Sequence, residues 1–337
     1  MTPRFGRLLH LGNVVIDIVL DVPALPERGG DVLATGTEMT PGGGFNVLAA
    51  AARQGLRAAY AGCHGSGPLA ALARAALAEA GIEVLQPPKP GADTGFVVSI
   101  VDAGGERTFV TSPGAEATMT AADLAGISAG PGDAVYLSGY GLLYPANQLA
   151  LLDWLGRLGD ASVVFADPGP LVHLIPPPVL DRVMARADWW SCNAREAERL
   201  TGSRDPAAAA SALAARVGRP AAGRHGAGQH EAGQHGARPG YGGTAGVLVR
   251  IGPSGCLLCH RGTAPVHVPG FPADAVDTNG AGDAHTGTFI AALAGGADDV
   301  DAARTANAAA ALSVTRRGPA TAPTAAELAR FLSGPGR

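Results

Sequence analysis

The chain has 337 residues, enough for one large α/β domain with a sizeable core, and its formal net charge is −4. It has no basic run, so the composition argues against a nucleic-acid partner and a membrane partner and favours small molecules. Its only lysine is Lys89 in "PPKP", which excludes a Walker A loop, a protein-kinase strand lysine and a pyridoxal phosphate Schiff base.

The N-terminal stretch at 8–19, "LLHLGNVVIDIV", is apolar and follows basic residues, as a signal peptide does. Asp17 and Asp21 interrupt this region, and no cleavage site of small residues follows. The stretch therefore predicts a buried first strand. Because no segment reaches the length of a transmembrane helix, we expect a cytoplasmic protein.

Strand-like apolar runs alternate with alanine-rich helical patterns along most of the chain. Further strands are predicted at 58–63, 134–139, 162–167, 188–193 and 246–252, and helices at 45–55, 68–80, 146–158, 195–217, 281–295 and 299–315. This alternation is typical of βαβ units. It predicts a single domain over 1–337 of the α/β class, a three-layer α/β/α arrangement with a mostly parallel central sheet.

Two stretches depart from this pattern, about 31–41 and about 94–112. Both alternate apolar and polar residues, and the second has a turn at Asp102, Gly104 and Gly105. Such alternation predicts half-exposed antiparallel strands. We expect the two stretches to form one small antiparallel β lid that covers the site and excludes water from it. The lid is also the surface at which a homodimer is expected.

The four cysteines are too few and too scattered for a disulfide framework, so we expect reduced thiols. The segment "CLLCH" at 256–260 matches the pattern for c-type haem attachment. That chemistry needs an exported context, and the run between Gly255 and Gly262 has the character of a strand. We therefore expect a strand here.

Residues 219–243 form a low-complexity insert of Gly, Ala, Gln and His. Its composition predicts a flexible surface loop. His225, His230 and His235 recur every five residues, a spacing that does not place them on one helical face, so we expect no metal site there.

The segment at 277–289, "DTNGAGDAHTGTF", is the strongest candidate for a functional motif. It is a poor dinucleotide fingerprint, because the third glycine is replaced by His285 and the run lies near the C-terminus. As a helix start it fits better, because Gly280, Ala281 and Gly282 allow successive N–H groups to point at one anion with the helix dipole behind them.

Asp283 follows these small residues in the first turn of the predicted helix. A carboxylate beside an anion pocket can accept a proton from an alcohol while the pocket stabilises a transferring phosphoryl group. The alternative is that Asp283 only caps the helix. Because Asp277 and Thr278 already supply capping groups, the pattern favours a catalytic base.

This segment resembles the C-terminal signature of the ribokinase-like (PfkB) carbohydrate kinases, and "PGGGFNVLAAAARQG" at 41–55 resembles their N-terminal signature. The resemblance extends from about residue 8 to 330. It implies a ribokinase-like fold and an ATP-dependent kinase that uses Mg²⁺ to phosphorylate a hydroxyl of a sugar or sugar-like small molecule. The runs "YLSGYGLLYP" and "GAGDAH" most resemble the YegV-like branch of bacterial sugar kinases.

The resemblance also implies roles for single residues. Asp283 would be the base and Gly280, Ala281 and Gly282 the anion hole. The substrate would be held by residues of the N-terminal signatures, namely Asp17, Gly43, Gly44 and Asn46. Arg107, on the lid, is either a solvated strand charge or a contact to the sugar.

On the nucleotide side, the resemblance implies that Asn193 and Glu196 of "NARE" organise Mg²⁺ and the phosphates through water, with help from Asp277. Gly252 and Gly255 of "RIGPSG" would belong to the nucleotide-binding loop, and Asn307 to the adenine side. Many family members also use a monovalent cation such as K⁺ near positions like Asp277 and Gly318.

Two alternatives stay open. A nucleoside (adenosine-type) kinase needs apolar or aromatic residues to stack the base, for which the lid offers mainly Phe96 and Phe109. A catalytically silent sugar or nucleotide sensor has no need of Asp283. The sequence leaves undecided whether His285 faces the core or the substrate.

Overall fold

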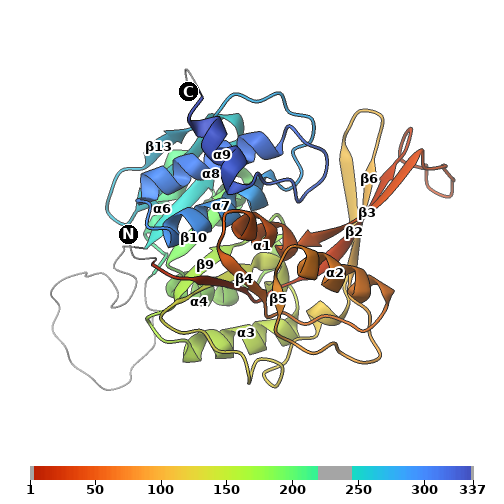
Figure 1. The fold of residues 1–337 in the computed structure, drawn as a ribbon, viewed down its shortest axis with the longest axis horizontal. Coiled ribbons are helices and arrows are strands. Elements are labelled where there is room, and N and C mark those ends of the chain that lie inside the picture. Colours follow the sequence, from red (N-terminus) through yellow and green to blue (C-terminus); the bar gives the residue numbers. More distant parts are fainter. Residues whose placement is uncertain (1–3, 219–244, 335–337) are drawn as a thin grey trace.

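The structure is a computed structural model and describes residues 4–218 and 245–334. The insert at 219–243, with its three histidines, therefore lies outside the described residues. The described residues form two sheets, one of nine strands and one of four. Figure 1 shows the small sheet projecting from one side of the α/β body.

The large sheet has the strand order β13-β12-β11-β10-β9-β8-β1-β4-β5. All its pairings from β5 to β11 are parallel, and β12 alone runs in the opposite direction, antiparallel to both β11 and β13. The mostly parallel sheet is thus confirmed. Its strands are β1 (Arg7–His10), β4 (Arg57–Tyr60), β5 (Glu83–Val84), β8 (Asp133–Ser138), β9 (Val163–Asp167), β10 (Trp189–Asn193), β11 (Gly246–Arg250), β12 (Gly255–His260) and β13 (Val266–Pro269).

Helices cover both faces of this sheet, as Figure 1 shows. One core forms under α1 (Gly44–Arg53), α2 (Pro68–Glu79), α7 (Ala281–Ala294) and α8 (Asp299–Ser313). The other forms under α3 (Pro145–Arg157), α4 (Pro177–Arg186), α5 (Ala194–Thr201) and α6 (Pro206–Ala214). Successive strand residues alternate between the two cores, for example Trp189 and Trp190. The three-layer prediction is confirmed.

The helix predictions need two corrections. The stretch 195–217 is two helices, because Gly202 ends α5 in the left-handed region (φ 76°) and Asp205 and Pro206 begin α6. Two helices have no counterpart among the predictions: α4 and α9 (Ala325–Leu332), which packs on α8. Both are short, and α4 begins within a proline run that resembles a loop in sequence.

The small sheet has the order β3-β2-β6-β7. Its strands are β2 (Val14–Asp21), β3 (Gly36–Gly43), β6 (Phe96–Val101) and β7 (Arg107–Ser112). The predicted hairpin turn is confirmed, since Asp102 Oδ1 accepts the N–H groups of Gly104 and Glu106 at 2.8 and 3.0 Å. Residues 31–35 precede the strand that was expected to include them.

The prediction of a single strand over 8–19 is wrong. The chain breaks at 11–13, so β1 joins the large sheet while β2 becomes an inner strand of the lid, antiparallel to β3 and parallel to β6. Gly12 lies at this break, where an added Cβ would lie 2.5 Å from the His10 ring. The sequence pattern does not show this break, because both strands are buried and apolar at the ends where they meet.

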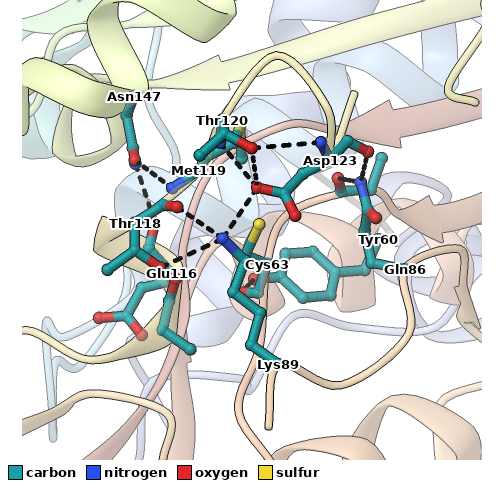
Figure 2. Close-up of polar contacts among 12 residues, drawn as sticks. Tyr60, Cys63, Gln86, Lys89, Glu116, Thr118, Met119, Thr120, Asp123 and Asn147 are labelled. Carbon is teal, nitrogen blue, oxygen red and sulfur yellow. Dashed lines mark hydrogen bonds and ion pairs between the residues drawn. The ribbon is translucent and has the colours of Figure 1, made fainter. Parts of the chain in front are cut away.

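Lys89 is tied to its surroundings, as Figure 2 shows. Its Nζ lies 2.8 Å from Asp123 Oδ2 and donates to the carbonyl of Thr118 at 2.5 Å. None of these partners is a predicted site residue, so the lysine holds loops together. The four cysteines are buried and unpaired, and Cys256 and Cys259 face opposite cores, which does not suit haem attachment. Among the described residues no helix is long and apolar enough to cross a bilayer.

Candidate active site

The carboxyl ends of three neighbouring parallel strands bring polar groups together: Asp167 ends β9, Asn193 ends β10 and Arg250 ends β11. Ligands in open α/β sheets bind at this edge. The Arg250 guanidinium lies 2.9 Å from Asp167 Oδ2 and 3.7 Å from Glu196 Oε2. Its side chain is 14% exposed, so this cation is held inside the protein by the two carboxylates.

Arg250 opens the segment "RIGPSG", yet the sequence pattern gives it no role. Two hydroxyl groups also contact its guanidinium, Ser191 Oγ and Thr286 Oγ1. A Cβ added at Gly282 would lie 3.4 Å from Arg250 Nε, so the guanidinium sits against the start of α7. The sequence does carry one signal that could have identified Arg250: it is a charged residue that directly follows the buried run 246–249.

Helix α7 begins with a backbone shape that requires glycine. Gly280 has φ 74°, and an added Cβ would lie 1.9 Å from the carbonyl oxygen of Pro319. Within the described part of the chain, the N–H groups of Gly282 and Asp283 have no hydrogen-bond partner. Of the predicted anion-hole residues, Ala281 donates its N–H to the Thr278 carbonyl at 3.4 Å. The free donors at the positive end of the helix are therefore the N–H groups of Gly282 and Asp283, and the anion hole stays a prediction.

Two helix starts converge beside this point. Asn46, in the first turn of α1, donates through Nδ2 to Asp283 Oδ2 at 3.0 Å. The close crossing of α1 and α7 depends on small residues, since a Cβ added at Gly287 would lie 2.4 Å from the Val47 carbonyl oxygen. Asn46 and Asp283, 237 positions apart, are thus brought together as predicted.

Asp17 lies next to the same pair. A Cβ added at Gly42 would lie 2.4 Å from its carboxylate, and Gly43 (φ 63°) borders Asn13. The amide oxygens of Asn13 and Asn46 are buried and have no hydrogen-bond partner among the described residues. Such groups are available to the hydroxyls of a ligand. Gly44 packs against His10, whose ring an added Cβ would overlap. Its predicted contact with substrate stays a prediction.

The carboxyl groups of the site carry raised pKa values. Burial and the charge of Asp283 raise the pKa of Asp17 to about 7, and burial and Asp167 raise that of Glu196 to about 7. Burial also raises the pKa of Asp283 to about 6, although the hydrogen bond from Asn46 opposes the shift. The site therefore holds more carboxyl groups than Arg250 can pair, and burial disfavours the ionised form of each of these three.

Tyr140 is a further residue of this region that the sequence does not single out. Burial, Asp283 and Asp17 together raise the pKa of its phenol to about 12, so it stays protonated. Its hydroxyl can donate a hydrogen bond toward the carboxylates or toward a ligand between them. Tyr140 belongs to "YLSGYGLLYP", the run that carries the resemblance to one branch of the family.

The lid reaches the site through Arg107. Its Nη2 lies 2.8 Å from Asp277 Oδ1, while Asp277 Oδ2 accepts the N–H of Gly318 at 3.1 Å. The structure thus brings Arg107, Asp277 and Gly318 together. Arg107 is a partly buried, paired charge and not a solvated one.

On the predicted nucleotide side, Asn193 and Glu196 form a capping box at the start of α5, with bonds of 2.8 and 2.9 Å. Gly252 lies in an exposed turn, and Gly255 (φ 96°) packs against the carbonyl of Val268. The motif "NARE" therefore has a structural role in addition to its predicted one.

Asn307 is 5% exposed and is engaged within the protein. It donates to the carbonyls of Val268 and Pro269, and its Oδ1 lies 3.1 Å from His285 Nε2. Contact of Asn307 with adenine stays a prediction, because these bonds place it in the packing of α7, α8 and β13. His285 is buried, and burial lowers its pKa to about 3, so it is a neutral core residue.

The described residues contain no group of three or more His, Cys, Asp or Glu side chains arranged to bind a metal directly. Asn193, Glu196 and Asp167 do supply hard oxygen atoms and excess negative charge at one edge of the sheet. This donor set suits Mg²⁺, which keeps much of its water shell. Water-mediated binding of Mg²⁺ by Asn193 and Glu196, with help from Asp277, stays a prediction.

Comparison with known proteins gives matches along nearly the whole chain. The model of the family described as "pfkB family carbohydrate kinase" matches residues 7–326. The uncharacterized sugar kinase YegV of Escherichia coli (strain K12) is 34% identical over 322 residues, which cover 95% of this chain and 92% of that protein.

Solved structures share the fold at lower identity. Arabidopsis thaliana ribokinase, solved with ribose and ATP, is 22% identical with a TM-score of 0.75, over 99% of this chain and 100% of that one. Adenosine kinase from Sinorhizobium meliloti is 19% identical with a TM-score of 0.78, over 97% and 99%. A sugar kinase and a nucleoside kinase thus share this fold, which confirms the ribokinase-like architecture without deciding the substrate.

Proposed function

The chain belongs to the pfkB family of carbohydrate kinases, and from this premise we propose that it transfers the γ-phosphate of ATP to a hydroxyl of a sugar or sugar-like small molecule. One observation carries the proposal. Asp283 is held by Asn46 at the start of α7, beside the unpaired N–H groups of Gly282 and Asp283 itself. A base and an anion pocket therefore lie within one helical turn.

Asp283 acts as the base in this proposal. With a pKa of about 6, it is ionised at neutral pH, yet it is a better proton acceptor than an ordinary aspartate. The hydrogen bond from Asn46 to Oδ2 fixes the carboxylate and leaves Oδ1 to accept the proton of the acceptor hydroxyl. The α7 N–H groups and the adjacent Arg250 stabilise the charge on the transferring phosphoryl group.

Residues on the lid side of the site bind the acceptor in this proposal. Asp17 and the unpaired amide oxygens of Asn13 and Asn46 accept hydrogen bonds from substrate hydroxyls. Gly43 keeps the backbone free of a side chain beside them. These acceptors suit a polyhydroxylated molecule.

On the nucleotide side, Asn193 and Glu196 would hold the water shell of Mg²⁺, with help from Asp277. The ion would supply positive charge to neutralise the phosphates. The excess of carboxylates over cations at β9, β10 and β11 supports such an ion. Gly252 and Gly255 shape the turn assigned to the nucleotide.

Asp283→Asn tests the mechanism. The variant keeps the size and one oxygen of the side chain but cannot take a proton, so we expect kcat to fall by roughly a hundredfold or more. Binding of ATP and sugar should change little, as measured by calorimetry. An unchanged kcat would contradict the role of Asp283 as base. A loss of ATP binding would instead show that the residue supports the fold of the site.

The substrate class is tested by ADP release with a panel of pentoses, hexoses, keto acids and nucleosides. A sugar kinase should respond to one polyhydroxylated class. Preference for adenosine would favour the nucleoside kinase, for which Phe96 and Phe109 are the candidate base contacts. ATP and sugar binding without turnover across the panel would favour the silent sensor.

A further inference from the structure

The surroundings of Asp277 do not fit the monovalent cation that the family resemblance implies there. Its Oδ1 lies 2.8 Å from Arg107 Nη2 and accepts the N–H of Asn279 at 2.8 Å. Its Oδ2 accepts the N–H of Gly318 at 3.1 Å. Three donors therefore use most of the lone pairs that a cation would coordinate.

Gly318 is also oriented against a cation. It directs its N–H, and not its carbonyl oxygen, at Asp277, and its carbonyl lies 3.3 Å from the Thr321 hydroxyl, which can donate to it. A K⁺ ion needs several oxygen ligands that replace its hydration shell. The guanidinium already beside the carboxylate would in addition repel it.

We propose that Arg107 supplies, from the lid, the positive charge that a monovalent cation would supply beside Asp277, so that phosphotransfer by this chain does not depend on K⁺. The inference rests on the proposed kinase function. Arg107 is a positioning residue here: it touches Asp277 and not the reacting atoms.

The place of Asp277 explains how such a charge acts on the site. Asp277 begins the loop that leads into Gly280 and the free N–H groups of α7, and its bond to the N–H of Asn279 shapes that loop. Arg107 contacts Oδ1, the same carboxylate oxygen that accepts the N–H of Asn279. Because Arg107 starts β7, this charge is present only while the lid lies against the loop. The anion hole and lid closure are thereby coupled.

The test compares K⁺ with tetramethylammonium, a cation that oxygen ligands do not coordinate, at an equal ionic strength of about 0.1 M. Wild-type protein should release ADP at the same rate in both salts. Arg107→Ala should lose roughly tenfold or more of kcat in tetramethylammonium. K⁺ should restore part of that loss, because removal of the guanidinium leaves room and charge for the ion. Arg107→Lys should keep most of the activity in both salts.

Arg157→Ala is the matched control, since Arg157 forms an exposed pair with Asp153 on α3. It should match the wild type in both salts. A second measurement, the melting temperature, needs no turnover: K⁺ should stabilise Arg107→Ala relative to tetramethylammonium but not the wild-type protein.

Activation or stabilisation of the wild-type protein by K⁺ would overturn the inference. So would an Arg107→Ala variant that behaves as wild type, or one that K⁺ neither activates nor stabilises. If no variant shows kinase activity with any acceptor, the proposed function fails. The melting temperatures still decide whether the cation binds.

Discussion

At the scale of single residues, Arg250 is the centre of the site's electrostatics. Its guanidinium touches Asp167 and Glu196 and packs against Gly282, where the transferring phosphoryl group is proposed to bind. Buried charges of this kind persist when they are paired and hydrogen-bonded. In a chain whose only lysine lies elsewhere, Arg250 is the cation that the described structure places next to the proposed anion hole.

Arg250→Met should therefore damage both activity and stability. Loss of the cation leaves two carboxylates unpaired, and breaking such a pair costs about 3 kcal/mol or more in the free energy of unfolding. We expect kcat to fall roughly a hundredfold. Arg250→Lys keeps the positive charge but lacks the planar guanidinium group. Its activity and stability should therefore lie between those of Arg250→Met and those of the wild-type protein. Urea unfolding and ADP release measure the two effects.

Arg204→Ala serves as the control, because its pair with Glu198 is exposed and should contribute little to stability. Equal stability of Arg250→Met and the wild-type protein would show that the buried pair carries no net stabilisation. Full activity of the same variant would remove Arg250 from the proposed mechanism.

The residues that could be predicted from the sequence are those in long motifs. Asp283, Asn46 and Asp17 stand in recognisable signatures, and they do converge. The sequence patterns give Arg250 and Tyr140 no role, because their importance comes from neighbours that are distant in sequence, such as Asp167. The sequence likewise does not predict the pairing of Arg107 with Asp277, because each residue has a plausible role by itself.

At the scale of elements, the site depends on how closely α1 and α7 cross. Asn46 and Asp283 meet because the helix axes approach at Gly287. A Cβ there would lie 2.4 Å from the Val47 carbonyl and 2.7 Å from Ala50 Cβ, closer than packed atoms allow.

Gly287→Ala should thus force the helices apart, although alanine is the better helix former. We expect a loss of about 1–3 kcal/mol in the free energy of unfolding and a lower kcat, because Asn46 and Asp283 separate. Gly295→Ala at the end of the same helix is the control: its added Cβ would meet only ordinary contacts, so stability should hold or rise. A stable, fully active Gly287→Ala variant would show that the crossing can relax.

Helices and strands can be predicted where the hydrophobic periodicity agrees with the polar, glycine or proline residues that bound a segment. The strands that end in Asp167 and Asn193 are short apolar runs bounded by polar residues, and their positions are confirmed within a residue. The stretch 8–19 was not divided correctly, because its two strands have the same composition and only tertiary packing at Gly12 separates them. Glycine and proline mark the helix break at Gly202 in the sequence, but the alanine residues on both sides favour one continuous helix.

At the scale of the whole molecule, the buried carboxyl groups of the candidate active site are expected to lower the stability of the fold once they ionise. Asp17, Glu196 and Asp283 all have raised pKa values, because burial and mutual repulsion disfavour their charged forms. The folded chain therefore binds more protons than the unfolded chain between about pH 4 and 7. Stability contributed by these groups is present below about pH 4 and is lost as the pH rises through 6 to 7.

Activity and stability should consequently respond to pH in opposite directions. The value of kcat/KM should rise as the pH passes through about 6, the pKa of Asp283, and level off about one pH unit higher. The contribution of these three groups to the free energy of unfolding falls over the same range. Asp17→Asn removes one ionisation and should be more stable than the wild-type protein at pH 8 but equal at pH 4, with impaired sugar binding. Urea unfolding at several pH values measures the difference, and Asp153→Asn on the exposed face of α3 controls for loss of a surface charge. If Asp17→Asn destabilises the protein equally at both pH values, its ionised carboxylate is compensated in the fold, and the raised pKa does not describe the folded chain.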